Sequence, residues 1–174
     1  MLIGLVYEIT ILIFVFKKKA IMDFFQLIRE GKLESIKTMV ELDKNIIHQR
    51  NERGFTPLIL AGYSNNLDLT LYFLSQGADI NEVDVAGNTA LMGVCFKGNL
   101  DIAKALIASN AKLNVVNFSG ATALIYATMF GQTEIVRVLL NSGADKTIKD
   151  AEGNTASTHA KLKGFLEIAK ILVK

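Results

Sequence analysis

The sequence has few of the residues from which metal sites and disulfides are usually built. Its 174 residues include one cysteine, Cys95, and two histidines, His48 and His159. A single cysteine excludes an internal disulfide, which fits a reducing compartment. The two histidines fall near opposite ends of the chain, so they are poorly placed to bind a metal ion together with Cys95. We therefore expect no metal site.

Motifs of the common enzyme classes are also missing. No glycine-rich phosphate loop ends in Lys followed by Ser or Thr, and no Gly-x-Ser-x-Gly nucleophile elbow occurs. Cys95 lies within a predicted helix, and we interpret it as a small buried apolar side chain. The sequence thus predicts no catalytic residue, no cofactor and no enzymatic activity.

The chain has no large excess of charge of either sign. Nineteen basic and 17 acidic side chains give a net charge of +2, which does not favour binding to nucleic acid. Hydrophobic residues make up 51% of the chain and charged residues 21%, a composition that supports a packed core and argues against disorder. Proline occurs once and tryptophan not at all, and no Pro- or Ser-rich linker divides the chain.

The sequence does contain an internal repeat, in which three landmarks recur at a spacing of 33 residues. The first landmark places a threonine after a glycine, in Gly54-Phe55-Thr56-Pro57-Leu58, Gly87-Asn88-Thr89-Ala90-Leu91, Gly120-Ala121-Thr122-Ala123-Leu124 and Gly153-Asn154-Thr155-Ala156-Ser157. The second is Gly77-Ala78-Asp79, Asn110-Ala111-Lys112 and Gly143-Ala144-Asp145. The third is Asn65, Gly98, Gly131 and Gly164.

Each landmark has a physical role in a pair of helices. A threonine hydroxyl can cap the free N–H groups at the start of a helix, and Pro57 then falls at the first helical position, where no N–H is needed. Glycine or asparagine tolerates the left-handed backbone that ends the first helix. The following segments are apolar at helical spacing, as at Leu67, Leu71 and Leu74. Because one helix pair cannot bury its apolar face alone, neighbouring pairs must stack.

In its period and in the Gly-x-Thr-Pro/Ala-Leu and Gly-Ala-Asp motifs, the chain resembles the ankyrin-repeat family over about residues 22–174. The resemblance implies an all-α solenoid of helix-turn-helix repeats of 33 residues with hairpin-like turns. We predict repeats at about 22–50, 51–83, 84–116, 117–149 and 150–174, with the outer two as degenerate caps. The family often has a histidine after Thr-Pro-Leu, but here that position holds Ile59, Met92, Ile125 and Thr158. We therefore expect packing between repeats to be more apolar than is usual.

Residues 1–21 form a separate apolar segment in which Lys17-Lys18-Lys19 follow the run from Leu2 to Phe16. The run is short for a membrane-spanning helix and contains Glu8. Three interpretations remain open. Translation starts at Met22; the segment is a short membrane anchor with the repeats on the cytoplasmic side; or it is an unusual signal peptide. We expect a monomeric cytoplasmic protein, which contacts a membrane only through this segment.

The resemblance also implies a binding surface, because ankyrin repeats bind partners through their turn tips and the exposed side of their first helices. The residue seven positions after each threonine should form one row on the concave face: Tyr63, Phe96, Met129 and Leu162. Lys97 and Phe130 are immediate neighbours of this row, and Phe55, Val85 and Phe118 are apolar residues predicted on the turns. We expect Phe118 to be exposed, whereas Tyr63 and Phe96 are either exposed or packed between repeats.

These features predict a protein-protein interaction module, either an adaptor or a scaffold. Aromatic and methionine side chains on a groove are typical of protein interfaces, whereas a nucleic-acid groove would carry Lys and Arg. The alternative hypothesis is a dedicated inhibitor or immunity-type protein that blocks one enzyme or toxin.

Overall fold

The computed structural model describes the backbone of residues 2–173 and the side chains of residues 15–173. These residues form ten α-helices and one 3-10 helix and contain no β-strand. The elements are α1 (Leu2–Glu30), α2 (Leu33–Leu42), η1 (Lys44–His48), α3 (Pro57–Tyr63), α4 (Leu67–Ser75), α5 (Ala90–Lys97), α6 (Leu100–Ala108), α7 (Ala123–Met129), α8 (Thr133–Asn141), α9 (Ala156–Leu162) and α10 (Leu166–Val173). The predicted all-α solenoid is confirmed.

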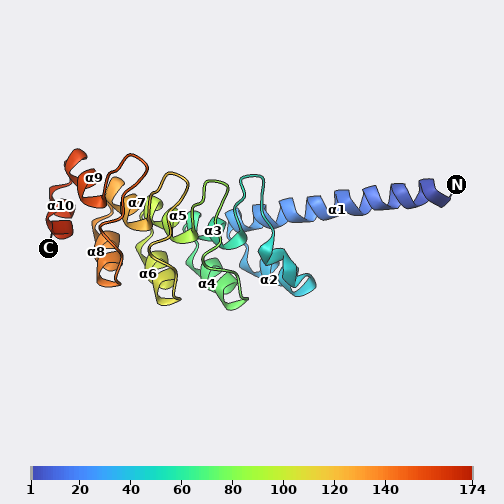
Figure 1. The fold of residues 1–174 in the computed structure, drawn as a ribbon. Helices are drawn as coiled ribbons and strands as arrows, with labels where there is room; N and C mark the ends of the chain where they lie inside the picture. The colour runs from blue at the N-terminus through green and yellow to red at the C-terminus, as the bar shows by residue number, and fades with distance from the viewer. Residues whose placement is uncertain (1, 174) are drawn as a thin grey trace.

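The helices stack in two parallel rows (Figure 1). The first helices α3, α5, α7 and α9 contact one another in order, and α1 contacts α3 at the start of this row. The second helices α4, α6, α8 and α10 form the other row in the same way. The extended loops between repeats lie along one edge of the array (Figure 1). One hydrophobic core therefore runs through all the repeats instead of closing within any one of them.

The helix boundaries follow the landmarks of the repeat. The hydroxyl of each repeated threonine accepts a hydrogen bond from the backbone N–H three residues later, at 3.2 Å in Thr56, 3.3 Å in Thr89 and Thr122, and 3.2 Å in Thr155. The residues predicted to end the first helices are all left-handed, with φ of 55° at Asn65 and between 69° and 81° at the three glycines. Both predictions are confirmed.

The positions that lack the family's histidine are part of the core. Ile59 is 3% exposed, and Met92 and Ile125 are each 1% exposed. Thr158 is half-buried, and its hydroxyl lies 3.1 Å from that of Thr155. Apolar packing between repeats is therefore present at these positions, as the sequence predicted.

The loops contain a feature that the sequence interpretation missed. Asn51, Asp84, Asn117 and Asp150 recur at the repeat spacing, and one side-chain oxygen of each accepts hydrogen bonds from two backbone N–H groups of its own loop. Neighbouring loops are joined as well, because Phe118 N–H donates to the carbonyl of Ala86 at 3.1 Å and Ala151 N–H donates to that of Ser119 at 2.9 Å. These bonds hold the loops as a stacked series.

At the N-terminal end, α1 runs from Leu2 to Glu30, so the predicted boundary between residues 21 and 22 falls inside one helix. Its last two turns serve as the first helix of the first repeat, with Phe24, Phe25 and Ile28 in the core. Most of the apolar segment 1–21 lies outside the residues whose side chains are described. Within the described part, no helix has both the length and the apolarity to span a membrane. The three interpretations of this segment stay predictions.

The contact between loops can be tested with two glycines at equivalent positions, Gly120 and Gly153. Both have positive φ, of 73° and 81°. A methyl group on Gly120 would lie 2.8 Å from the backbone nitrogen of Ala151, whereas one on Gly153 would meet no atom within 4 Å. We expect Gly153→Ala to lower the free energy of unfolding by about 1 kcal/mol, the cost of left-handed backbone. Gly120→Ala should cost about 1 to 3 kcal/mol more, because the next loop must move.

The measurement is urea unfolding of the two variants and the wild type, followed by circular dichroism. Equal destabilisation by the two substitutions would contradict close loop stacking.

Candidate functional site

The first helices and the residues next to them carry a continuous row of five aromatic rings, which we call the aromatic ladder: Phe55, Tyr63, Phe96, Phe130 and Tyr126. The ring centroids lie 5.8 Å apart for Phe55 and Tyr63, 6.0 Å for Tyr63 and Phe96, 4.5 Å for Phe96 and Phe130, and 6.4 Å for Tyr126 and Phe130. These separations are those of interacting aromatic pairs. The ladder spans three successive repeats without a break.

The repeat itself places these rings. Tyr63 ends α3 and Phe96 lies next to the end of α5, at the same position in successive repeats, and Phe130 directly follows α7. Since successive first helices stack side by side, residues at one repeated position meet across the boundary between repeats. Tyr63 and Phe96 stack with an interplanar angle of 9°, and Phe130 meets Phe96 edge-on at 77°.

The sequence left open whether Tyr63 and Phe96 are exposed or packed between repeats, and the structure shows that both descriptions hold in part. Tyr63 and Phe96 are half-buried, so each is packed on one side and open to solvent on the other. Phe130 is 44% exposed. The ammonium group of Lys97 lies 4.6 Å from the ring centroid of Tyr63 and 6.0 Å from that of Phe96. Lys97 therefore covers the junction of these two rings through cation–π contacts.

Two of the predicted site residues pack partly against the core. Phe55 lies in the loop directly before Thr56 and is half-buried against the core and Tyr63. Met129 is also half-buried and packs against the core, and the row of rings continues through its neighbour Phe130. A role of Phe55 and Met129 in binding stays a prediction.

Tyr126 was not predicted as part of this surface. It lies four residues before Phe130 and so on the same helix face, which is the signal that could have identified it. Its hydroxyl accepts a hydrogen bond from Asn117 Nδ2 at 3.1 Å, and the same nitrogen donates to Asn88 Oδ1 at 2.7 Å. This network ties the end of the ladder to two neighbouring loops.

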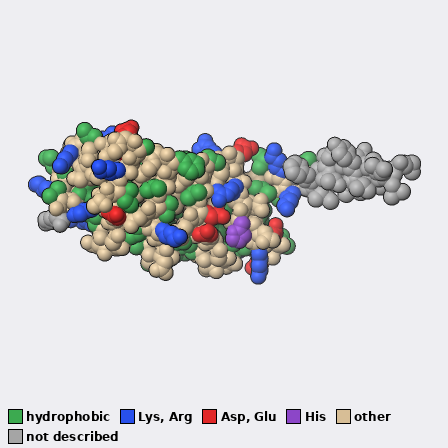
Figure 2. Space-filling model, viewed as in Figure 1, with side chains coloured by type: hydrophobic (Ala, Val, Ile, Leu, Met, Phe, Trp, Pro, Cys, Tyr) green, Lys and Arg blue, Asp and Glu red, His purple; other side chains and the backbone are tan. Residues whose placement is uncertain are grey.

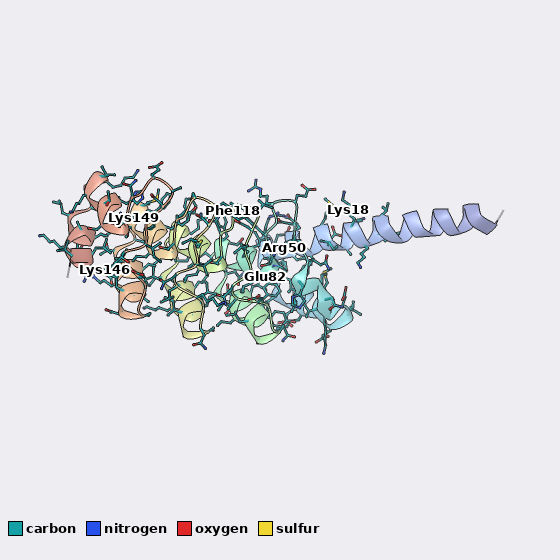
Figure 3. All side chains as sticks on the ribbon, viewed as in Figure 1. Lys18, Arg50, Glu82, Phe118, Lys146 and Lys149 are labelled. Carbon is teal, nitrogen blue, oxygen red and sulfur yellow. The ribbon has the colours of Figure 1, made fainter. Side chains whose placement is uncertain are left out.

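Two exposed apolar side chains lie at the tips of the middle loops. Val85 is 70% exposed and Phe118 is 81% exposed, as the sequence predicted for Phe118. The equivalent tips of the outer loops carry Glu52 and Ala151. Figure 2 shows hydrophobic side chains emerging between the loops and the first helices, and Figure 3 places Phe118 at the loop edge. Large apolar side chains thus occur only at the two middle tips of these four loops.

The side chains most often used in catalysis or metal binding are either buried or already paired with another side chain here. Cys95 is completely buried, and this burial raises the pKa of its thiol. His159 contacts the carboxylate of Asp150. Burial of this carboxyl raises its pKa, but hydrogen bonds from His159 and from two backbone N–H groups of the loop have the larger effect. The pKa of Asp150 is therefore lowered. Among the described residues, no cluster of His, Cys, Asp and Glu is suited to hold a metal ion.

The fold and the repeated surface define a helical repeat solenoid, and comparison with known proteins identifies its family. The family model "Ankyrin repeats (3 copies)" matches residues 63–150 and 91–174, which together cover more than half of the chain. The chain belongs to the ankyrin-repeat family.

Individual relatives match only short stretches. The ankyrin repeat and SAM domain-containing protein 6 of Rattus norvegicus is 35% identical over 71 residues, covering 40% of this chain and 8% of the relative. An ankyrin repeat protein of fowlpox virus, FPV230, is 38% identical over 63 residues, covering 36% of this chain and 34% of the relative. Alpha-latroinsectotoxin-Lt1a of Latrodectus tredecimguttatus is 33% identical over 70 residues, covering 36% of this chain and 5% of the relative. The chain spans only about a third of the fowlpox protein and less than a tenth of the other two relatives.

The burial of Cys95 predicts its reactivity. Because the thiol is inaccessible and its pKa is raised, it should not react with DTNB in the native protein at pH 8. The same chain unfolded in urea should release one equivalent of thionitrobenzoate, since Cys95 is the one cysteine of the sequence. Rapid labelling without denaturant would show that α5 opens or that the thiol is exposed.

The ladder and the tips should differ in their effect on stability. Phe96→Ala removes a half-buried ring that contacts two others, so we expect it to cost about 2 kcal/mol, less than a fully buried phenylalanine. Phe118→Ala removes a ring that is 81% exposed and should change the free energy of unfolding by less than about 0.5 kcal/mol. Chemical unfolding of both variants measures the difference. A larger cost for Phe118→Ala would mean that its ring supports the loops.

Proposed function

We propose that this chain is a non-catalytic adaptor or scaffold that binds a partner protein through the aromatic ladder and the tips Val85 and Phe118. Ankyrin repeats are protein-protein interaction modules, and the family is typically non-catalytic. The observation that carries the proposal is the continuity of the surface. Five rings in contact run across three repeats, and an exposed phenylalanine, Phe118, is held on a loop with internal hydrogen bonds.

The chemistry of the surface favours a protein over a nucleic acid. Lys97 is the one basic side chain with a cation–π contact to the ladder rings among the described residues, and its ammonium group already lies over Tyr63. A groove for nucleic acid needs several Lys and Arg side chains to neutralise phosphates. Aromatic side chains, in contrast, are enriched at the centres of protein interfaces, where they contribute most of the binding energy.

The loops make Phe118 a suitable anchor for a partner. Asn117 accepts hydrogen bonds from the backbone of Ser119 and Ala121, and Phe118 N–H is bonded to the preceding loop. The loop is therefore ordered before binding, so little conformational entropy is lost on association. Complete burial of the Phe118 ring against a partner would contribute about 1.5 to 3 kcal/mol.

Partner capture tests the proposal directly. With the immobilised chain as bait in an extract of its source cells, Phe118→Ala should weaken capture of the main partner about tenfold or more, because each 1.4 kcal/mol is tenfold in affinity. Leu42→Ala is the matched control, since Leu42 is 83% exposed but lies on the second helix α2. Both variants should keep the helix content of the wild type.

Equal capture by the Phe118→Ala variant and the wild type would overturn the proposed surface. The stoichiometry of the captured complexes separates the two functional hypotheses. Several partners bound at moderate affinity indicate an adaptor or scaffold. One partner bound tightly at equimolar ratio, with loss of that partner's activity, indicates a dedicated inhibitor.

A further inference from the structure

A groove opens at the N-terminal end of the array, between α1 and the first loop. Its volume is about 1150 Å³, and its walls include Lys17 and Arg29 from α1 and Arg53 from the loop. Pockets for small molecules typically enclose about 300 to 1,000 Å³, so this groove is large for such a ligand. Its size is better suited to a segment of polypeptide.

The groove exists because the first loop has no loop before it. Within the array the third and fourth loops bond to their predecessors, since Phe118 N–H bonds to Ala86 and Ala151 N–H bonds to Ser119. The chain reaches the loop of residues 50–55 from α2 and η1, and α1, which packs on α3, continues away from the array (Figure 1). One face of this loop is therefore left uncovered by a neighbouring loop, and the groove follows that face.

A buried hydrogen-bond donor in the groove lacks its partner. In the interior of the array, Asn117 Nδ2 donates to Asn88 Oδ1 of the preceding loop at 2.7 Å. Asn51 occupies the equivalent position two repeats earlier and lines the groove. Its Nδ2 is buried and has no hydrogen-bond acceptor among the described residues. An unsatisfied buried donor is costly, so Asn51 makes the first loop less stable than the interior loops.

The walls of the groove are predominantly basic. Five basic side chains and two acidic side chains line it, although the whole chain has 19 basic and 17 acidic residues. Arg50 is engaged by Glu82 at 3.6 Å and by the carbonyl of Gly54 at 2.8 Å. Arg29 and Arg53 form no ion pair with any described side chain and remain available for a ligand. Figure 3 shows Lys18 and Arg50 at this end of the array.

The floor of the groove is apolar. Ile21 from α1 and Phe55 and Tyr63 from the second repeat line it, and all three are half-buried. A ligand that fits must therefore combine negative charge for the walls with an apolar group for the floor. A flat bilayer surface cannot enter a groove of this kind, whereas an extended peptide can place alternate side chains on the walls and the floor.

We propose that this groove binds an acidic peptide segment of a partner protein, with carboxylates on Arg29, Arg53 and the lysines of α1 and one apolar side chain on the floor. The inference is independent of Phe118 and of the distal half of the ladder, so either surface can bind without the other.

The probe is a random dodecapeptide library displayed on phage, selected against the full chain. We expect the enriched peptides to carry more Asp and Glu than Lys and Arg, together with a Phe, Leu or Ile. A labelled peptide from this selection should bind the double variant Arg29→Glu/Arg53→Glu at least about tenfold more weakly, since attraction is replaced by repulsion. Replacing the apolar residue of the peptide with serine should also weaken binding.

A further variant serves as a control. Lys146→Glu/Lys149→Glu makes the same change in net charge near the opposite end of the array (Figure 3) and should leave the affinity unchanged.

Three results would overturn the proposal. The first is that the selected peptides show no excess of acidic residues. The second is that the two charge-reversed variants bind the peptide equally. The third is that no peptide is enriched, while phosphatidylserine vesicles bind in a manner that depends on Arg29 and Arg53. Phe118→Ala should retain peptide binding. This outcome distinguishes failure of the ladder as an interface from failure of the groove.

Discussion

No helix pair in this chain can bury its apolar face without its neighbours, and this dependence on stacking organises the rest of the molecule. The core residues of each first helix pack against the first helices before and after it, as Ile59, Met92 and Ile125 do at one repeated position. Stacking brings residues of the same position into contact across repeats. The aromatic ladder is a direct consequence, because Tyr63 and Phe96 are neighbours in space through their shared position in the repeat.

The same constraint shapes the loops and explains how the two ends differ from the middle. An interior loop has a neighbour on both sides, so its tip is held in place and can present an apolar side chain such as Phe118 to solvent. The first loop has a helix where a preceding loop would lie, which leaves Asn51 without an acceptor and opens a groove. One repeated architecture thus produces two chemically different surfaces, an apolar one at the centre and a basic one at the N-terminal end.

Features set by backbone conformation could be predicted from the sequence, because they depend on a few local residues. The threonine caps and the left-handed residues Asn65 and Gly98 are of this kind. The direction of individual side chains could not be predicted with equal success. Phe130 continues the ladder in place of Met129, and Phe55 turns inward, because ring packing between repeats selects among positions that differ by one residue.

The groove was beyond prediction for a different reason. It depends on α1 continuing without a break through residues 21 and 22, whereas the apolar segment and the first repeat were interpreted as separate units. It also depends on the absence of a neighbouring loop, which no local pattern records. Side chains as far apart in the sequence as Lys17 and Tyr63 meet only after the array has assembled.

The central claim is that partners bind the face formed by the loops and the first helices. Hydrogen–deuterium exchange of the chain, free and bound to its captured partner, tests this claim most directly. Binding on that face should slow exchange in the loops around Val85 and Phe118 and at the ends of α5 and α7, while α4, α6 and α8 exchange as in the free chain. Protection centred on α4, α6 and α8, with the loops unchanged, would contradict it.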